Sequence, residues 1–308
     1  MKSRRITISA AVCLVVSMTA SVLLLRNIDR LRPNQSNDDV LYLDSPKLIR
    51  KASLGFDGLM ACIYWTRAVQ YFGVRHHAGA QTYNELAPLL EITTQLDPQL
   101  VPAYELGASF LAPAPPEGAG EPKRAVQLMH YGIAHNPDNW RLYYDLGFVY
   151  YTELKDYKHA SEVFEHGSLT PNAHPAMKVL AARMAENGGD LITARMLWST
   201  TYQSSKDSTI RQSALAHLRA LQVDEDVTNL QNVVKRFANQ NGRPPTSMWE
   251  LAAAEHWAEV PADPDGVPYT LSLDGQVLVA NPDDLPFITK GTPPGYEPGR
   301  PKFDTKVN

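Results

Sequence analysis

The chain has 308 residues, with 29 Lys or Arg and 33 Asp or Glu, so its net charge is −4. This balance gives no basic field of the kind that nucleic acid requires, which argues against a nucleic-acid partner. Of the two cysteines, Cys13 lies in an apolar segment and Cys62 beyond it, so no disulfide can join two soluble positions. The length is sufficient for a helical array and one small additional domain.

The N-terminus carries an apolar segment, residues 6 to 25, with 15 apolar side chains among 20 uncharged residues. About 20 such residues cross a bilayer as a helix, so the segment is a membrane span or a signal peptide. Arg26 follows Leu25 directly, with no small-x-small cleavage site, and this favours a retained signal anchor. Basic residues flank both ends of the segment, so the charges do not determine its orientation. The short N-terminal tail favours a cytoplasmic N-terminus, and this predicts a single-pass inner-membrane protein with most of its chain in the periplasm. Residues 26 to 40 are polar and predict a tether.

The first soluble helix is predicted over residues 58 to 72, with Asp57 as its cap. Trp65 lies on this helix, and a second helix carries Leu86. The run from Leu41 to Gly73 resembles the opening of a group of bacterial membrane-anchored repeat proteins.

Three further stretches repeat one spacing of small, bulky and aromatic residues. Leu106, Leu146 and Leu180 follow one another at intervals of 40 and 34 residues. A second repeated feature is an alanine followed four residues later by a bulky side chain, and it recurs at intervals of 35 and 34 residues. The gap of four residues places the alanine and the bulky side chain on one helix face. Periods of this length indicate stacked helical hairpins. The pairs are Ala125 and Met129, Ala160 and Phe164, and Ala194 and Trp198.

This pattern resembles the tetratricopeptide repeat (TPR) family across residues 97 to 206. The copy from Tyr143 to Phe164 matches best, after one inserted residue, and a weaker copy precedes the three. The resemblance implies a mostly α fold, an α-α superhelical solenoid over residues 41 to 222 behind the single transmembrane helix of residues 1 to 25.

In that family, fixed positions on the first helix of each repeat line a concave groove. One interpretation of the aromatic residues at these positions is ordinary packing between helices. The other is a groove that holds an extended or helical peptide by aromatic anchors, while Arg141 and Lys178 meet an acidic group. The groove residues that the resemblance implies are Trp65, Tyr104, Arg141, Tyr144, Phe148, Tyr151 and Lys178.

Residues 223 to 282 are predicted to form a small α+β cap. A helical period runs from Asp224 to Asn241, and a short helix follows with Thr246 or Ser247 as its cap. Asp274-Gly275, between two alternating stretches, predicts the turn of a β-hairpin.

The cap also resembles the region after the first helix of major pseudopilins, through Gly242-Arg-Pro-Pro and the later run from Pro261 to Tyr269. The membrane segment lacks the pseudopilin leader, so the chain is not expected to be a filament subunit itself. Loops of that family bind calcium, yet Asp-Pro and Asp-Gly also form turns without metal, so no metal or other cofactor is predicted. The tail, residues 283 to 308, is predicted to be flexible. The calcium candidates are Asp263, Asp265, Asp283 and Asp284.

Catalytic signatures are missing from the sequence. It contains no His-Glu-x-x-His, no Gly-x-Ser-x-Gly and no phosphate loop, so we expect a protein that is not an enzyme, and a hydrolase is the least favoured alternative. The function expected is a membrane-anchored scaffold that binds a partner protein or peptide and supports assembly of an envelope, secretion or pilus-type complex. The alternative is a structural spacer or oligomerisation component whose groove is filled by its own residues 26 to 52 or by its tail.

Overall fold

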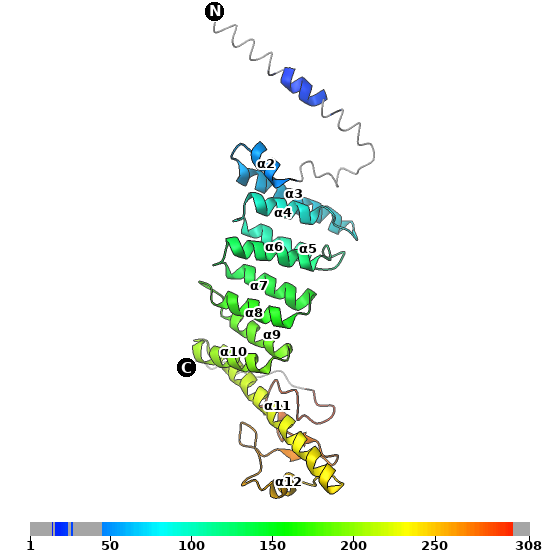
Figure 1. The fold of residues 1–308 in the computed structure, drawn as a ribbon, viewed down its shortest axis with the longest axis vertical. Helices are drawn as coiled ribbons and strands as arrows, with labels where there is room; N and C mark the ends of the chain where they lie inside the picture. The colour runs from blue at the N-terminus through cyan, green and yellow to red at the C-terminus, as the bar shows by residue number, and fades with distance from the viewer. Residues whose placement is uncertain (1–13, 15, 24–25, 27–44, 298–308) are drawn as a thin grey trace, which may run out of the picture. The chain divides into compact units, whose positions relative to one another are not determined.

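The computed structural model describes residue 14, residues 16–23, residue 26 and residues 45–297. These residues are mostly helical, and one small antiparallel sheet lies near the C-terminal end (Figure 1). The predicted anchor and tether lie largely outside the described residues. Within the described part, no helix combines the length and the apolar character needed to cross a membrane. The chain divides into two compact units, Met1–Pro98 with Ala114–Ala119 and Gln99–Pro113 with Gly120–Asn308.

The first unit contains α2 (Pro46–Ala52), α3 (Asp57–His77) and α4 (Leu86–Leu96). The prediction of a helix over residues 58 to 72 is confirmed, and the helix continues to His77. The prediction that Asp57 caps it is wrong, because Phe56 occupies the N-cap position and no side chain caps the helix. Asp57 lies in the first turn, accepts a hydrogen bond from Ser53 Oγ and forms an ion pair with Arg50 Nε at 3.5 Å.

The second unit begins with three helical hairpins. They are α5 (Val101–Leu111) with α6 (Pro122–His135), α7 (Trp140–Phe148) with α8 (Tyr157–Ser168), and α9 (Ala176–Asn187) with α10 (Leu191–Ser204). Each helix packs against the next in chain order, so the hairpins form successive layers (Figure 1). The alanine and bulky positions of the repeated spacing are all fully buried between the layers: Ala125, Met129, Ala160, Phe164, Ala194 and Trp198.

Glycines on these helices leave room for aromatic rings. A Cβ atom at Gly147 would lie 2.5 Å from the ring of Phe164, and one at Gly132 would lie 2.7 Å from the ring of Tyr104. Contacts this short exclude any side chain at these positions. These two glycines therefore set how closely α5 approaches α6 and how closely α7 approaches α8.

The register of α5 differs by one residue from the expected alignment. Tyr104 is fully buried, and its ring packs on Gly132 of the following helix, as Tyr143 packs on Gly167 one hairpin later. Leu106, which the repeated spacing aligns with the fully buried Leu146, is 45% exposed. Tyr104 is thus equivalent to Tyr143, at an interval of 39 residues rather than 40. Gly107 and Ala108 are both small, so the spacing alone could not decide which of the two faces the neighbouring helix.

A π turn, η2 (Val149–Glu153), continues α7. Leu154 N–H donates to the carbonyl of Val149, five residues earlier, at 3.2 Å. A π turn holds one residue more than an α turn. It lies in the interval where the sequence carries one residue more than the TPR pattern, so it accommodates the insertion without disturbing the packing of α8.

Helix α11 (Ser208–Asn241) is a single helix of 34 residues. It begins 16 residues before Asp224, the predicted start, and crosses the predicted domain boundary at residue 222. Asp207 caps it by accepting from the backbone N–H groups of Thr209 and Ile210, and Gly242, at φ 72°, ends it. Its first half joins the core of α8 to α10 and its second half joins the core of the cap.

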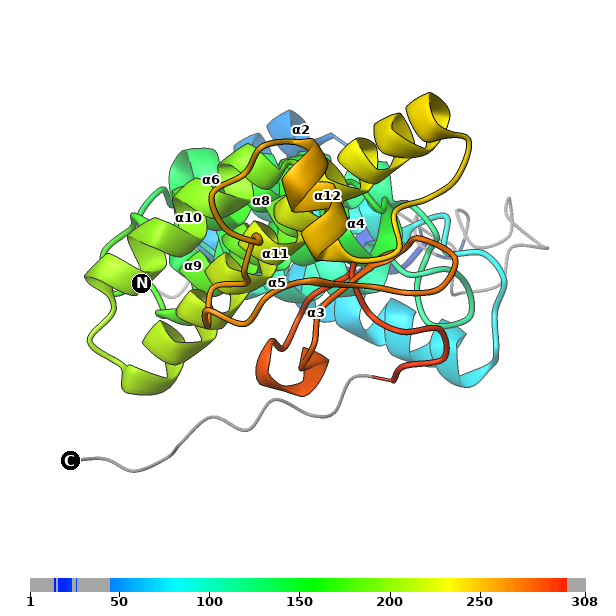
Figure 2. The same cartoon turned by 90° about the horizontal axis from the view of Figure 1, so that it is seen from below.

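The cap consists of α12 (Met248–Ala254), β1 (Thr270–Leu271), β2 (Val277–Leu278) and the short η3 (Pro282–Asp284). The predicted β-hairpin is confirmed, with Leu271 paired to Val277. Ser247 is confirmed as the N-cap residue of α12, because its hydroxyl accepts from Glu250 N–H at 3.2 Å. The hairpin lies beside α11, where Gln231 Nε2 donates to Gly275 O at 2.9 Å. Helix α12 lies against the C-terminal half of α11 in both views, and apolar residues of the two helices share one core (Figure 1 and Figure 2).

The segment after the hairpin is packed where a flexible tail was expected. Leu285 is buried in the core of the cap, and Val279 N–H donates to Gly291 O at 2.8 Å. We call residues 285–291 the C-terminal strap. Residues 298–308 of the predicted tail lie outside the described part.

Candidate functional site

The residues predicted to line the groove have different environments in the structure. Trp65 is half-buried on α3 of the first unit. Tyr104 is fully buried, so the prediction that it lines an accessible groove is wrong, for the reason of register given above. Arg141 and Tyr144 are exposed on α7, and Phe148 and Tyr151 are half-buried beside them. Lys178 is half-buried on α9.

The aromatic residues of α7 and its π turn form a continuous row, which we call the α7 ladder and define as Trp140, Tyr144, Phe148 and Tyr151. Successive ring centroids are separated by 6.1, 4.7 and 6.2 Å. The ring of Phe148 also contacts the buried ring of Phe164, edge to face, with centroids 5.5 Å apart. This contact anchors the ladder to the core. Spacings of four, four and three residues place these side chains on one side of the helix.

Two basic side chains predicted for the groove are already held by neighbours. The guanidinium of Arg141 lies over the ring of Trp140, 5.1 Å from its centroid. Lys178 Nζ donates to Ser204 Oγ on α10 at 2.9 Å. Arg141 therefore lies against the first ring of the ladder, whereas Lys178 is bound to the second helix of its own hairpin.

Asp145 lies next to the ladder and was not identified from the sequence. Burial raises the pKa of its carboxyl from 3.8 to about 7, and repulsion from Glu105 adds to the increase, while Arg141 opposes it. A carboxyl group whose pKa is raised in this way, beside a partly exposed aromatic row, is a candidate member of a binding surface. One signal in the sequence pointed to it, because Asp145 directly follows Tyr144, a predicted groove residue.

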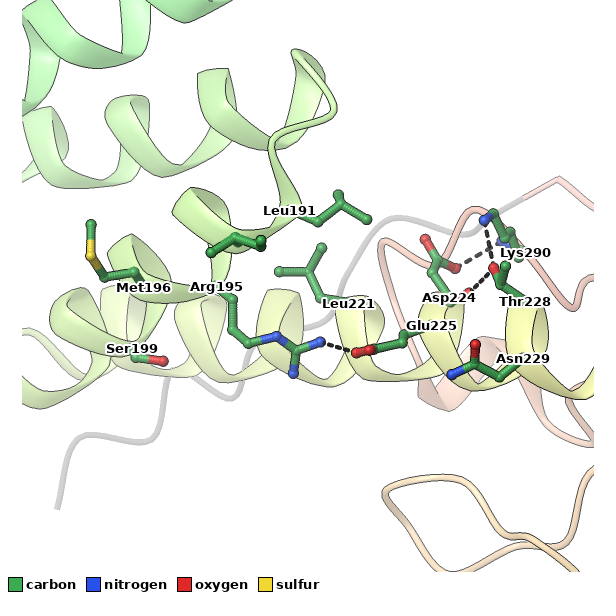
Figure 3. A pocket seen from close by; sticks show the side chains of 11 residues that line it. Leu191, Arg195, Met196, Ser199, Leu221, Asp224, Glu225, Thr228, Asn229 and Lys290 are labelled. Atoms are coloured by element: carbon green, nitrogen blue, oxygen red, sulfur yellow. Dashed lines mark hydrogen bonds and ion pairs between the residues drawn. The ribbon is translucent and has the colours of Figure 1, made fainter.

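The structure also contains a hollow of about 550 Å³ between α10 and α11, shown in Figure 3. Its apolar wall comes from α10, where Leu191, Ile192 and Met196 are 44%, 85% and 53% exposed. The remaining lining residues are Arg195, Ser199, Leu221, Asp224, Glu225, Thr228, Asn229 and Lys290.

Most of the charged groups in this hollow are paired. Arg195 Nη2 contacts Glu225 Oε2 at 2.6 Å. Asp224 is 9% exposed, and its carboxylate accepts from the backbone N–H of Thr289 and of Lys290, both at 2.9 Å, and from the Thr289 hydroxyl at 2.5 Å. Lys290 Nζ donates to the neutral hydroxyl of Thr228 at 2.6 Å (Figure 3).

The C-terminal strap is held on α11 by a stack of three rings. His217 lies between Trp198 and Phe287, with ring centroids 4.1 and 3.9 Å away and interplanar angles of 6°. His217 Nδ1 lies 3.0 Å from Glu186 Oε2 without hydrogen-bond geometry, and the same oxygen accepts from Trp198 Nε1–H at 3.0 Å. Phe287 has φ 74°, a conformation that is rare for a bulky residue, so the surrounding contacts hold the backbone there.

The calcium candidates serve turns and ion pairs. Asp263 accepts from the backbone N–H of Asp265 and Val267 at 2.9 and 3.0 Å. Asp265 pairs with Arg219 at 3.1 Å, and Asp283 accepts from the hydroxyl of Tyr296 at 2.8 Å, while Asp284 lies in η3. Among the described residues, no three His, Cys, Asp or Glu side chains are grouped so as to hold a metal.

Comparison of the chain with known protein families and with curated proteins finds no match. The geometry offers two surfaces suited to binding, the α7 ladder and the α10–α11 hollow.

Proposed function

We propose that the protein is a membrane-anchored scaffold of TPR type that binds a partner protein or peptide through the α7 ladder. The observation that supports this function is the row of partly exposed aromatic side chains on α7, fixed from below by Phe164. Preordered aromatic side chains contribute most of the binding energy at many protein interfaces, because they bury a large area at a small cost in entropy.

The cellular setting of this proposal comes from the sequence. The apolar segment of residues 6 to 25 supports a single-pass anchor in the inner membrane with the bulk of the chain in the periplasm. The resemblance of the cap to pseudopilins supports a role in assembling an envelope, secretion or pilus-type complex.

The test is photo-crosslinking of the full chain in native membranes. A photoreactive amino acid at Tyr144 is expected to capture a distinct partner protein, and the same group at Leu169, which is 76% exposed and lies outside the ladder, is the matched control. Tyr151→Ala should reduce the capture from position 144, since truncating an interface aromatic costs about 1–2 kcal/mol, roughly a tenfold loss of affinity.

Two outcomes would count against the proposal. Equal capture from Tyr144 and Leu169 would show that the ladder is not a preferred surface. Capture of only this chain's own segments would favour the structural spacer with its groove filled in cis.

A further inference from the structure

We infer that the α10–α11 hollow is a second binding site, for a segment of a partner protein that presents an apolar side chain next to a carboxylate. This site is independent of the α7 ladder, because it is built by α10, α11 and the C-terminal strap. Its size, about 550 Å³, is suited to a few side chains.

The apolar side chain of the ligand is inferred from the aliphatic residues that α10 presents to the hollow. Leu191, Ile192 and Met196 expose large aliphatic surfaces on one side of the hollow, and Leu221 of α11 is buried behind them. Covering this exposed aliphatic surface on binding removes it from water and so favours the complex.

The acidic group of the ligand is inferred from the charged residues that line the hollow. Arg195 and Glu225 neutralise each other, and Asp224 is satisfied by three donors of the strap. Within the described part of the chain, the ammonium group of Lys290 contacts the neutral hydroxyl of Thr228 and is not within ion-pair distance of a carboxylate. A ligand carboxylate at this end of the hollow would supply the missing negative charge.

A peptide fits these features better than an acyl chain does. The hollow is open and carries polar groups, Ser199 and Asn229, that suit a peptide backbone. A fatty acid would require a closed apolar channel.

The experiment is selection of random 12-residue peptides displayed on phage, using the full chain in lipid nanodiscs. Counter-selection against the Ile192→Asp variant removes peptides that bind elsewhere, including those that bind the ladder. The expected result is a consensus with an aliphatic residue adjacent to Asp or Glu.

Fluorescence anisotropy with one labelled consensus peptide then measures affinity. Lys290→Gln should weaken binding by about tenfold, and so should replacing the acidic residue of the peptide by its amide. Lys123→Gln, at an exposed position in the first turn of α6, should leave binding unchanged, as should Leu169→Asp and Tyr144→Ala. Circular dichroism and the melting temperature establish that every variant is folded. Failure to enrich any peptide, a consensus without an acidic residue, binding that ignores Lys290, or binding of palmitate in place of peptide would each overturn the proposal. The ladder proposal would survive all four results.

Discussion

At Gly147 the helix leaves space for the ring of Phe164 and for nothing more. A methyl group there would lie 2.5 to 2.8 Å from three ring carbons, and Phe164 is fully buried and cannot move aside. We expect Gly147→Ala to lower the free energy of unfolding by about 1–3 kcal/mol, because overpacking outweighs the gain in helix propensity. Urea unfolding followed by circular dichroism measures this change.

Gly73→Ala is the matched control, since this glycine is also helical and has no atom within 4 Å of its virtual Cβ. There the substitution should stabilise the protein by about 0.5–1 kcal/mol through helix propensity alone. Equal effects at both positions would contradict the packing argument.

Asp145 makes stability depend on pH near neutrality. Its pKa rises from 3.8 to about 7 on folding, so the native state holds a proton that the unfolded state has released, and stability falls as the pH rises from about 4 to 7. Asp145→Asn should remove this loss and stabilise the protein above pH 7 by about 1–2 kcal/mol, a value reduced for partial exposure to solvent.

The measurement is the free energy of unfolding of both proteins at about pH 3 and at pH 8. At about pH 3 the two should differ little, because the carboxyl is then protonated in both the native and the unfolded state. A variant that is equally stabilised at both pH values would show that the charge of Asp145 is not the cause.

At the scale of elements, the strap depends on the stack of Phe287 on His217. Phe287→Ala removes this contact, and since the ring is half-buried we expect a loss of about 1–3 kcal/mol in stability. The backbone N–H groups of Thr289 and Lys290, which donate to Asp224, should exchange with deuterium faster as the strap opens.

Leu273→Ala is the control, because Leu273 is a fully exposed apolar residue on the hairpin turn. It should change neither stability nor exchange. Unaltered protection of Thr289 and Lys290 in Phe287→Ala would mean that the carboxylate of Asp224 holds the strap without help from the stack.

At the scale of the whole molecule, the predicted anchor is tested by fractionation. The full chain should sediment with membranes and resist extraction at alkaline pH, and deletion of residues 1 to 25 should transfer it to the soluble fraction. A full chain that is extracted at alkaline pH would contradict the anchor. Leu169→Asp, a substitution on an exposed loop, should leave the fractionation unchanged.

The sequence by itself determined the helical hairpins and the β-hairpin of the cap. Small residues recur at nearly constant intervals because each must lie against a neighbouring layer of helices, so the spacing in the sequence reveals the layers. These residues are Ala125, Ala160 and Ala194, all fully buried. Local chemistry likewise determined Ser247 as a helix cap and Asp274-Gly275 as a turn, since both depend on contacts within a few residues.

Only the tertiary structure decided which of two adjacent small residues of α5 faces the neighbouring helix, and this choice buried Tyr104. It also decided that α11 continues through residue 222, that residues 285–291 pack on it, and that a hollow forms against α10. These features depend on contacts between residues up to 70 positions apart, such as His217 and Phe287. Periodicity and capping patterns predict which residues are buried and where helices begin and end. They do not specify which distant side chain packs against a given residue.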